Sequence, residues 1–241
     1  KKITKKTKVF LIVYVLGNCS NIQKIKSICK KKKIILVEDT CESLGTKYKN
    51  KFLGTFGDFG AFSFYYSHQV TSGEGGMIVC QNDEDYDILI SLRSHGWARK
   101  LINQKKYERK YKNLDNRFIF LNSGFNLRPT EIQAAIANNQ FKRMNKTCKI
   151  KKYNHNKIIK RLKNSKKWNN QFTFIVENKN VKSNWFGLSM LINHPHILKK
   201  KKFINYLTET GIENRPIISG NFINKKYFKL FKFKANKNTL L

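Results

Sequence analysis

The chain has 241 residues, of which 40% are hydrophobic, and 49 Lys+Arg against 15 Asp+Glu give it a formal net charge of +34. This length and apolar content allow one large domain, or one and a half ordinary ones, around a sizeable core. The apolar run from Val9 to Leu16 is far short of the ~20 residues that span a bilayer, and it lacks the small-residue cleavage site of a secretory signal. These features exclude a membrane span or signal in this run, and we expect a soluble, cytoplasmic protein.

The positive charge is compatible with a nucleic-acid or anionic-membrane partner. The lysines are spread along the whole chain among many asparagines, and no basic-aromatic motif of a nucleic-acid module accompanies them. A compositional bias of the source explains this pattern better than a binding role. We therefore expect neither a nucleic-acid partner nor a membrane partner.

The cysteines form no CxxC pair and have no histidine at metal-ligand spacing. Their odd number favours reduced, mostly buried thiols in a reducing compartment, and we expect no metal site. They are Cys19, Cys29, Cys41, Cys80 and Cys148.

The first forty residues read as strand, helix and strand. The run VFLIVYVLG, which starts at Val9 and ends at Gly17, predicts a strand buried on both faces. Residues 18–33 have helical spacing, with Ser20 as the expected N-cap. Residues 34–39 predict a second buried strand, which ends in two carboxylates.

Two short strands are expected next, at residues 61–66 and 76–81, on either side of a polar, Gly-rich connection. Residues 83–95 predict a helix with acidic residues favourably placed in its first turn. Residues 100–123 show no clear period and are expected to form a long loop.

Pro129 stands at a typical N1 position, and a helix is expected to open there and run well beyond residue 145. After about residue 150 the pattern predicts a smaller α+β domain. Trp185 and Phe186 are expected in the core of that domain. Its expected elements are strands near 172–176 and 185–192, a helix around 197–210 and a strand-like RPII at 215–218.

Alternating strands and helices in the first half predict a mostly parallel sheet, with the functional site at the carboxyl ends of its strands. Asp39 ends one strand and His68 follows another. A carboxylate at the end of a buried strand needs a cationic partner, although this segment alone favours Asp39 as the cap of a following helix. Likewise, His68 alone is either a packed, hydrogen-bonded residue or an imidazole that moves protons.

Several motifs in the right order resemble the DegT/DnrJ/EryC1/StrS sugar aminotransferase/dehydratase family of fold-type I pyridoxal phosphate (PLP) enzymes. They are EDTCESLG, SFYYSHQVTSGEGGMIV, LRSHGW and SGFNLRPTEIQAAI. The resemblance is strong over residues 8–145 and looser beyond, through NWFGLSM and GIENRPIISGNF. It implies an α/β fold: the three-layer aminotransferase large domain, incomplete at its N-terminus, over residues 1–150, and part of a small α+β domain over residues 151–241.

The resemblance also implies roles for individual residues. Asp39 matches the aspartate that holds the pyridine nitrogen of the cofactor, and Glu42 the residue that contacts its ring hydroxyl. Ser63 matches a serine that binds the cofactor phosphate. Asn126 matches an asparagine that reaches the phosphate in the partner subunit's site, which implies a homodimer.

His68 occupies the position of the family's catalytic lysine, and no lysine lies between Lys51 and Lys100. An imidazole cannot make the covalent bond to the cofactor, but it can still move protons. The resemblance therefore implies the sugar 3-dehydratase subgroup, which uses PLP and its pyridoxamine form, with glutamate as amino donor and a 4-keto-6-deoxy sugar nucleotide as substrate. Residues 97–147 contain no cysteine, which implies the branch without an iron–sulfur cluster.

His95 and Arg99 match substrate-side residues of that subgroup, the alternatives being a helix cap and a solvated cation. Family members are considerably longer than this chain, which we expect to be a fragment that is inactive by itself. Three other readings stay open at this point: a sugar-nucleotide 4-aminotransferase, an inactive truncated relative, and a basic binding protein built on an enzyme fold.

Overall fold

A computed structural model of the chain describes residues 3–217. The chain divides into two compact units. The first unit comprises Lys1–Asn164 and Val176–Leu188, and the second comprises Ser165–Ile175 and the residues from Ser189 onward. The boundary expected after residue 150 falls inside one long helix of the first unit, α4 (Glu131–Lys163).

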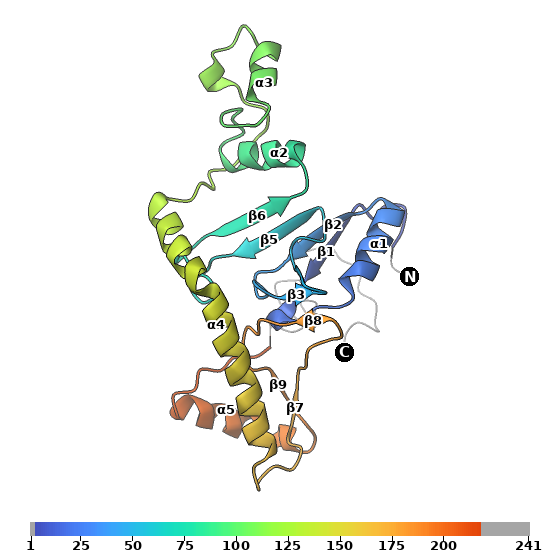
Figure 1. Ribbon diagram of the computed structural model, residues 1–241, viewed down its shortest axis with the longest axis vertical. Coiled ribbons are helices and arrows are strands. Elements are labelled where there is room, and N and C mark those ends of the chain that lie inside the picture. Colours follow the sequence, from blue (N-terminus) through green and yellow to red (C-terminus); the bar gives the residue numbers. More distant parts are fainter. Residues whose placement is uncertain (1–2, 218–241) are drawn as a thin grey trace. The chain divides into compact units, whose positions relative to one another are not determined.

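The first unit contains most of the regular structure (Figure 1). Its strands are β1 (Val9–Val13), β2 (Ile35–Asp39), β3 (Lys47–Tyr48), β4 (Lys51–Phe52), β5 (Phe59–Ser63), β6 (Gly76–Cys80) and β8 (Val181–Lys182). Its helices are α1 (Ile22–Lys32), α2 (Asp83–Arg93), α3 (Gln104–Lys110) and α4, with the short 3-10 turns η1 (Val15–Gly17) and η2 (Asn116–Phe118).

The main sheet has the strand order β1-β2-β5-β6. The strands β1, β2 and β5 are parallel, and β6 pairs antiparallel with β5. This arrangement confirms the expected α/β fold and its mostly parallel sheet. It also brings the carboxyl ends of β2 and β5 to the same edge of the sheet.

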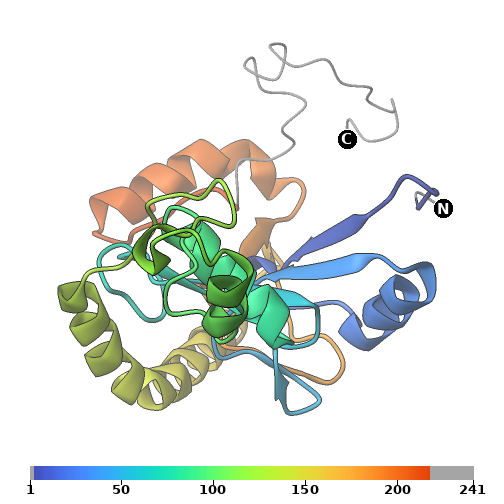
Figure 2. The same ribbon diagram turned by 90° about the horizontal axis from the view of Figure 1, so that it is seen from above.

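The two faces of this sheet differ in burial. Phe10, Ile12 and Leu36 face a core that α1 completes with Ile22 and Cys29. Figure 2 shows α1 on one side of the β1–β2 pair. The opposite face carries apolar side chains that remain about half exposed, so the expectation that the first strand is buried on both faces is wrong. They are Val9, Leu11, Val13 and Ile35.

The helix α1 begins one residue later than expected from the sequence, and α4 begins two residues later. The N-cap of α1 is Asn21, not Ser20, because the Asn21 side chain accepts a hydrogen bond from the Lys24 amide at 3.1 Å. Thr130 is the N-cap of α4 and forms a capping box with Gln133. Pro129 therefore precedes the cap. In both cases the side chain that reaches the amide three residues later determines the start of the helix.

The segment expected as a long loop, residues 100–123, contains α3 and η2. Its order comes from contacts that are distant in sequence. Leu101 and Ile119 form a small apolar cluster with Ala98. The buried carboxylate of Asp87 on α2 accepts hydrogen bonds from the backbone amides of Ile102 and Asn103 at 2.7 and 3.0 Å.

A small second sheet, of order β4-β3-β8, ties residues 176–188 to the first unit. Within this segment, the Asn184 amide donates to Thr46 Oγ1 at 3.0 Å, and the Ser183 hydroxyl donates to the Gly17 carbonyl at 2.5 Å. Trp185 and Phe186 therefore belong to the first unit. The placement of these two residues in the small-domain core is wrong.

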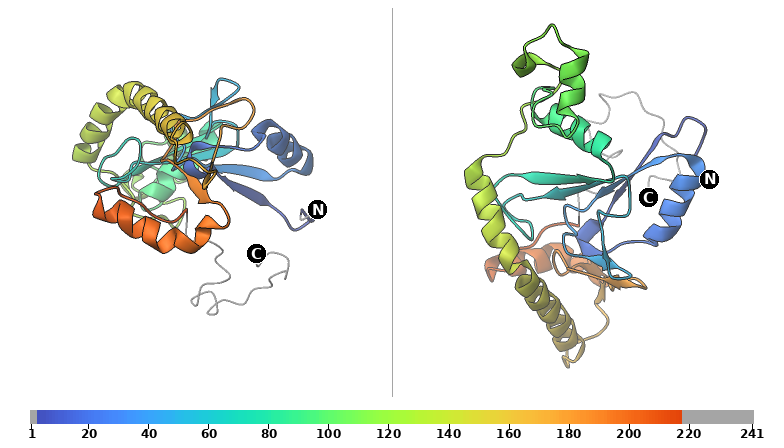
Figure 3. Two further views of the ribbon diagram at one scale, coloured as in Figure 1. Left: turned by 90° about the horizontal axis from the view of Figure 1, so that it is seen from below. Right: turned by 45° about the horizontal axis from the view of Figure 1, so that its top comes forward.

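The second unit contains a β-hairpin-like pair, β7 (Phe172–Phe174) and β9 (Met190–Ile192), followed by η3 (His196–Lys199) and α5 (Lys200–Glu209). Two strands and a helix were expected close to these positions. Figure 3 shows these elements in orange and red. Residues 215–217 form no strand, and the rest of the expected RPII strand, with SGNF, lies outside the described residues. Within residues 3–217, no helix has both the length and the apolar character required to cross a bilayer.

Candidate active site

The end of β2 carries two neighbouring carboxylates with different surroundings. Glu38 is fully buried and accepts four hydrogen bonds. One comes from the Tyr14 hydroxyl at 2.7 Å, and three come from backbone amides of residues 54–57 at 2.6 to 2.9 Å. Four donors satisfy a buried carboxylate, so Glu38 holds the 54–57 turn against the sheet. The motif did not separate this structural role from that of Asp39.

Asp39 faces the opposite side of the sheet, because successive side chains of a strand alternate. It is half-buried, and its Oδ1 accepts a hydrogen bond from the Cys41 amide at 3.0 Å. The residues that follow form turns and not a helix, so Asp39 is no helix cap. None of the ion pairs within residues 3–217 includes Asp39. Among residues 3–217 its carboxylate accepts from the amide and the thiol of Cys41, and it keeps lone pairs that a donor from a ligand can use.

Ser63 shares this face of the sheet. In the parallel register Asp39 is opposite Ala61, and Ser63 lies two residues further along β5, so its side chain points to the same side. The Ser63 hydroxyl accepts a hydrogen bond from the Tyr65 amide at 3.2 Å. A carboxylate and a hydroxyl thus stand at the carboxyl ends of neighbouring strands. The position of Asp39 agrees with the sequence pattern, whereas Ser63 ends β5 and was expected inside a strand at residues 61–66.

His68 lies in the loop that follows β5. Its backbone amide donates to the Tyr65 carbonyl at 3.0 Å, which closes a turn. Its ring packs edge-on against two aromatic rings, with centroid distances of 5.6 Å to Tyr65 and 5.3 Å to Phe186. Sequence analysis missed the second contact, since no local pattern links Phe186 to a residue 118 positions earlier. The Lys151 ammonium lies 5.9 Å from the Phe186 ring centroid, and burial lowers the pKa of this lysine.

Glu42 connects the loop of His68 to the end of β1. Its Oε2 accepts a hydrogen bond from the Leu16 amide at 2.8 Å. Its carbonyl accepts one at 2.8 Å from the side chain of Gln69, the neighbour of His68. The structure therefore brings Asp39, Glu42, Ser63 and His68 together through adjacent strands and loops of the first unit.

A cysteine that the sequence did not single out lies beside Asp39. Burial, together with the hydrogen bond and charge of Asp39, raises the pKa of the Cys41 thiol to about 12. Cys41 is consequently a neutral thiol at physiological pH and not a reactive thiolate. Within residues 3–217 no group of three or more side chains could hold a metal ion.

The remaining predicted residues form a second group between α2 and α4. Asn126 pairs with Ser94 across an isolated bridge, and its side-chain oxygen accepts a hydrogen bond from Arg128 at 3.2 Å. Arg128 lies 3.4 Å from the His95 ring nitrogen. Arg99 donates through its Nε to the Arg117 carbonyl at 2.8 Å. Asn126, His95 and Arg99 thus lie on one stretch of chain, separate in sequence and in contacts from Asp39 and His68.

The backbone explains why His95 points away from its helix. Ser94 is the C-cap of α2, and His95 follows in the left-handed conformation with φ of 62°. The Gly96 amide returns to the Ser91 carbonyl at 2.8 Å, as in a Schellman motif. A Cβ on Gly96 would overlap the Asn122 carbonyl oxygen, so glycine is required where the two chain segments meet.

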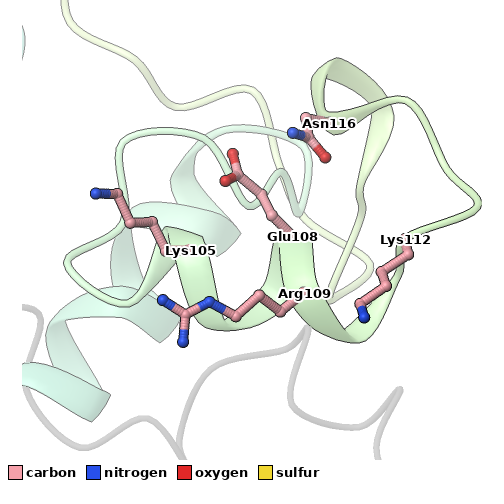
Figure 4. Close-up of a pocket in the computed structure, with 5 residues that line it drawn as sticks. All are labelled: Lys105, Glu108, Arg109, Lys112 and Asn116. Atoms are coloured by element: carbon pink, nitrogen blue, oxygen red, sulfur yellow. The ribbon is translucent and has the colours of Figure 1, made fainter.

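An open pocket on α3 contains neither group. Its lining is basic on balance, and the side chains in Figure 4 come from α3 and the residues just after it. None of the predicted site residues takes part. The lining residues are Lys105, Glu108, Arg109, Lys112 and Asn116.

Comparisons with known proteins agree on one family. The sequence profile of the DegT/DnrJ/EryC1/StrS aminotransferase family matches residues 1–239. The chain is 35% identical over 239 residues to the GDP-4-keto-6-deoxy-D-mannose 3-dehydratase of Escherichia coli O55:H7. The alignment covers 98% of this chain and 60% of the relative.

Solved structures give the same result. The structure of the E. coli GDP-4-keto-6-deoxy-D-mannose-3-dehydratase with bound hydrated PLP superposes with a TM-score of 0.82 at 35% identity, over 95% of this chain and 58% of that one. A variant of a GDP-4-keto-6-deoxymannose-3-dehydratase with bound GDP-perosamine has a TM-score of 0.82 at 34% identity, over the same shares of the two chains. The chain thus spans about 60% of the length of these relatives.

Proposed function

Because the chain belongs to the DegT/DnrJ/EryC1/StrS aminotransferase family, we propose that it forms the catalytic part of a PLP-dependent nucleotide-sugar 3-dehydratase. The substrate is a 4-keto-6-deoxy sugar nucleotide related to GDP-4-keto-6-deoxymannose, used in deoxysugar biosynthesis, and glutamate is the amino donor. The observation that carries this proposal is His68. It stands in the loop after β5, at the same sheet edge as Asp39 and Ser63, where the family pattern has a lysine.

The side chains at this edge fit the cofactor. Asp39 accepts from the amide and the thiol of Cys41, and its carboxylate can accept a further bond from a protonated pyridine nitrogen. Ser63 offers a hydroxyl to the phosphate, and Glu42 is anchored at the Leu16 amide, with its other oxygen available to the ring hydroxyl. When bound, PLP supplies an electron sink for breaking bonds next to the sugar carbonyl.

The imidazole of His68 acts in the proton transfers. With the cofactor bound, the imidazole would serve as the base beside the cofactor ring and as the acid that protonates the departing 3-hydroxyl oxygen of the sugar, which leaves as water. The rings of Tyr65 and Phe186 hold the imidazole in place and limit the access of water. A lysine at this position would bond covalently to the cofactor and so favour ordinary amino transfer. The imidazole of His68 forms no such bond, which favours dehydration.

The second group of residues completes a site on the partner subunit. Asn126 reaches the cofactor phosphate there, so the protein works as a homodimer, and His95 and Arg99 contact the substrate. The contacts of this group with one another, and not with Asp39 or His68, support this arrangement. The cysteines, all free thiols, suit a reducing, cytoplasmic compartment.

The test uses the encoded protein with PLP, glutamate and the 4-keto-6-deoxy sugar nucleotide. We expect the absorbance of the aldehyde form to be replaced by that of the amine form, followed by release of ammonia and a 3-deoxy product. The His68→Asn variant should lower the rate by about 10² to 10⁴, the usual contribution of a general acid–base. The His68→Lys variant should retain the cofactor through a bond that borohydride makes permanent.

Two outcomes contradict the proposal. A 4-amino sugar as the main product would identify an aminotransferase. The absence of both spectral change and product would identify an inactive relative.

A further inference from the structure

We propose that Trp97 is a positioning residue, whose indole holds His95 and Arg99 in the orientation that the nucleotide-sugar substrate requires. This inference rests on the proposed function, because it takes His95 and Arg99 as substrate contacts. Trp97 matches none of the functional positions considered so far. Its role follows from the side chains that surround it.

The indole lies at the centre of a cluster of cationic and titratable groups. The Arg99 guanidinium is 4.4 Å from the ring centroid, and the Arg128 guanidinium is 5.7 Å from it. The His95 ring packs against it with a centroid distance of 5.1 Å and an interplanar angle of 61°. Cations are attracted to the face of an indole, which is the best aromatic partner for this contact. Trp97 thus contacts all three of these side chains.

The backbone of this cluster is held firmly. Trp97 forms an isolated bridge with Phe120, and the two rings also pack together. The Leu121 amide donates to the Gly96 carbonyl at 2.7 Å, and the Ala98 amide donates to the Ile119 carbonyl at 2.9 Å. The indole therefore has a fixed base from which to orient more flexible side chains.

The indole is the nearer of two aromatic rings that restrain Arg99, at 4.4 Å from the guanidinium against 5.8 Å for the ring of Phe118. The Arg99 guanidinium donates to a single carbonyl, that of Arg117. One carbonyl leaves a long side chain free to rotate about that contact. Stacking on the ring of Trp97 fixes the plane of the guanidinium, which determines where its remaining donors point.

Trp97 does not act through a hydrogen bond of its indole N–H. Trp97 Nε1 is buried and has no hydrogen-bond partner in the described part of the chain. The ring face, and not the N–H, therefore carries the interaction. A phenyl ring should preserve much of it, whereas an aliphatic side chain of similar size should not.

The kinetic test compares Trp97→Leu and Trp97→Phe in the encoded protein. We expect Trp97→Leu to raise KM for the sugar nucleotide about tenfold while kcat changes by less than about threefold, as when binding contacts lose orientation. Trp97→Phe should restore KM to within about threefold of wild type. Trp168→Leu is the matched control, because Trp168 packs on Phe172 and Phe174 in the second unit. An unchanged KM in Trp97→Leu, or equal losses in the Leu and Phe variants, would overturn the inference.

A second measurement does not require turnover. GDP, the nucleoside diphosphate part of the substrate, should quench tryptophan fluorescence in the wild type and in Trp168→Leu, but not in Trp97→Phe. Quenching that persists in Trp97→Phe would count against a substrate site at this indole. Quenching that depends on Trp97 in a protein that performs no dehydration would refute the proposed function and leave the positioning role standing.

Discussion

At the scale of single residues, the neighbouring carboxylates Glu38 and Asp39 differ in burial and in the donors that they accept. Both are carboxylates at the end of one strand, and the sequence motif presents them as a pair. Glu38 accepts four protein donors and has no exposed surface, whereas Asp39 is half-buried and its carboxylate accepts only from the amide and the thiol of Cys41. One carboxylate therefore stabilises the fold, and the other is free to bind a ligand.

This difference predicts opposite effects of the two amide substitutions. Glu38→Gln places an N–H₂ group against donors and should lower the free energy of unfolding by about 3 kcal/mol or more. Asp39→Asn should change it by less than about 1 kcal/mol but abolish the proposed activity. Urea denaturation and the ammonia-release assay measure the two effects. Equal loss of stability in both variants would contradict the assignment.

The individual residues were predictable from the sequence only in part. Local apolar patterns predict Asp39 at the end of one strand and His68 after another, whereas the role of Ser63 is implied only by the family resemblance. The contact of Phe186 with His68 and the four donors to Glu38 join residues that are distant in sequence. No period or cap marks such contacts, so they need the folded structure.

At the scale of elements, the helices show where local sequence determines structure. The strands β2, β5 and β6 and the helix α2 were expected close to their observed positions, since each has its own apolar pattern or cap. The helix α3 was missed because Leu101, Ile119 and the Asp87 carboxylate stabilise it from outside its own residues. The start of α4 was predicted too early, because Pro129 suits the first helical position, whereas the capping box of Thr130 and Gln133 starts the helix at Glu131.

The capping box of α4 gives a prediction at this scale. Thr130→Ala removes the side-chain oxygen that accepts the Gln133 amide, and should lower the free energy of unfolding by about 1 kcal/mol. Thr147→Ala on the same helix is the control. The Thr147 hydroxyl only returns to the Arg143 carbonyl, so this change should be neutral or slightly stabilising. Similar losses from both substitutions, in thermal unfolding followed by circular dichroism, would show that the cap contributes nothing specific.

At the scale of the whole molecule, the open face of the main sheet is the most consequential feature. Val9, Leu11, Val13 and Ile35 lie next to one another in the register of β1 and β2 and are each 45–60% exposed. Contiguous apolar surface of this kind mediates association or aggregation. Asp39 lies on the same face, because it is paired with Val13.

We therefore expect the 241-residue chain to bind a hydrophobic dye and to self-associate. Leu11→Lys should reduce both, because it places a charge in the middle of the face, where the side chain is 60% exposed. Leu198→Lys is the control, since Leu198 is 84% exposed on η3 in the second unit. Light scattering and dye fluorescence measure the effects. If Leu198→Lys reduced association as strongly as Leu11→Lys, added charge in general, and not this face, would be responsible.

The alternation of side chains along β2 has a further consequence for how the protein tolerates random mutation. In a library of all single substitutions, selection for cellular abundance should deplete changes at Glu38 and leave most changes at Asp39 untouched. Selection for sugar dehydration should deplete both. Comparing the two selections position by position would distinguish residues required for folding from residues required only for catalysis. The adjacent positions 38 and 39 would then belong to different groups.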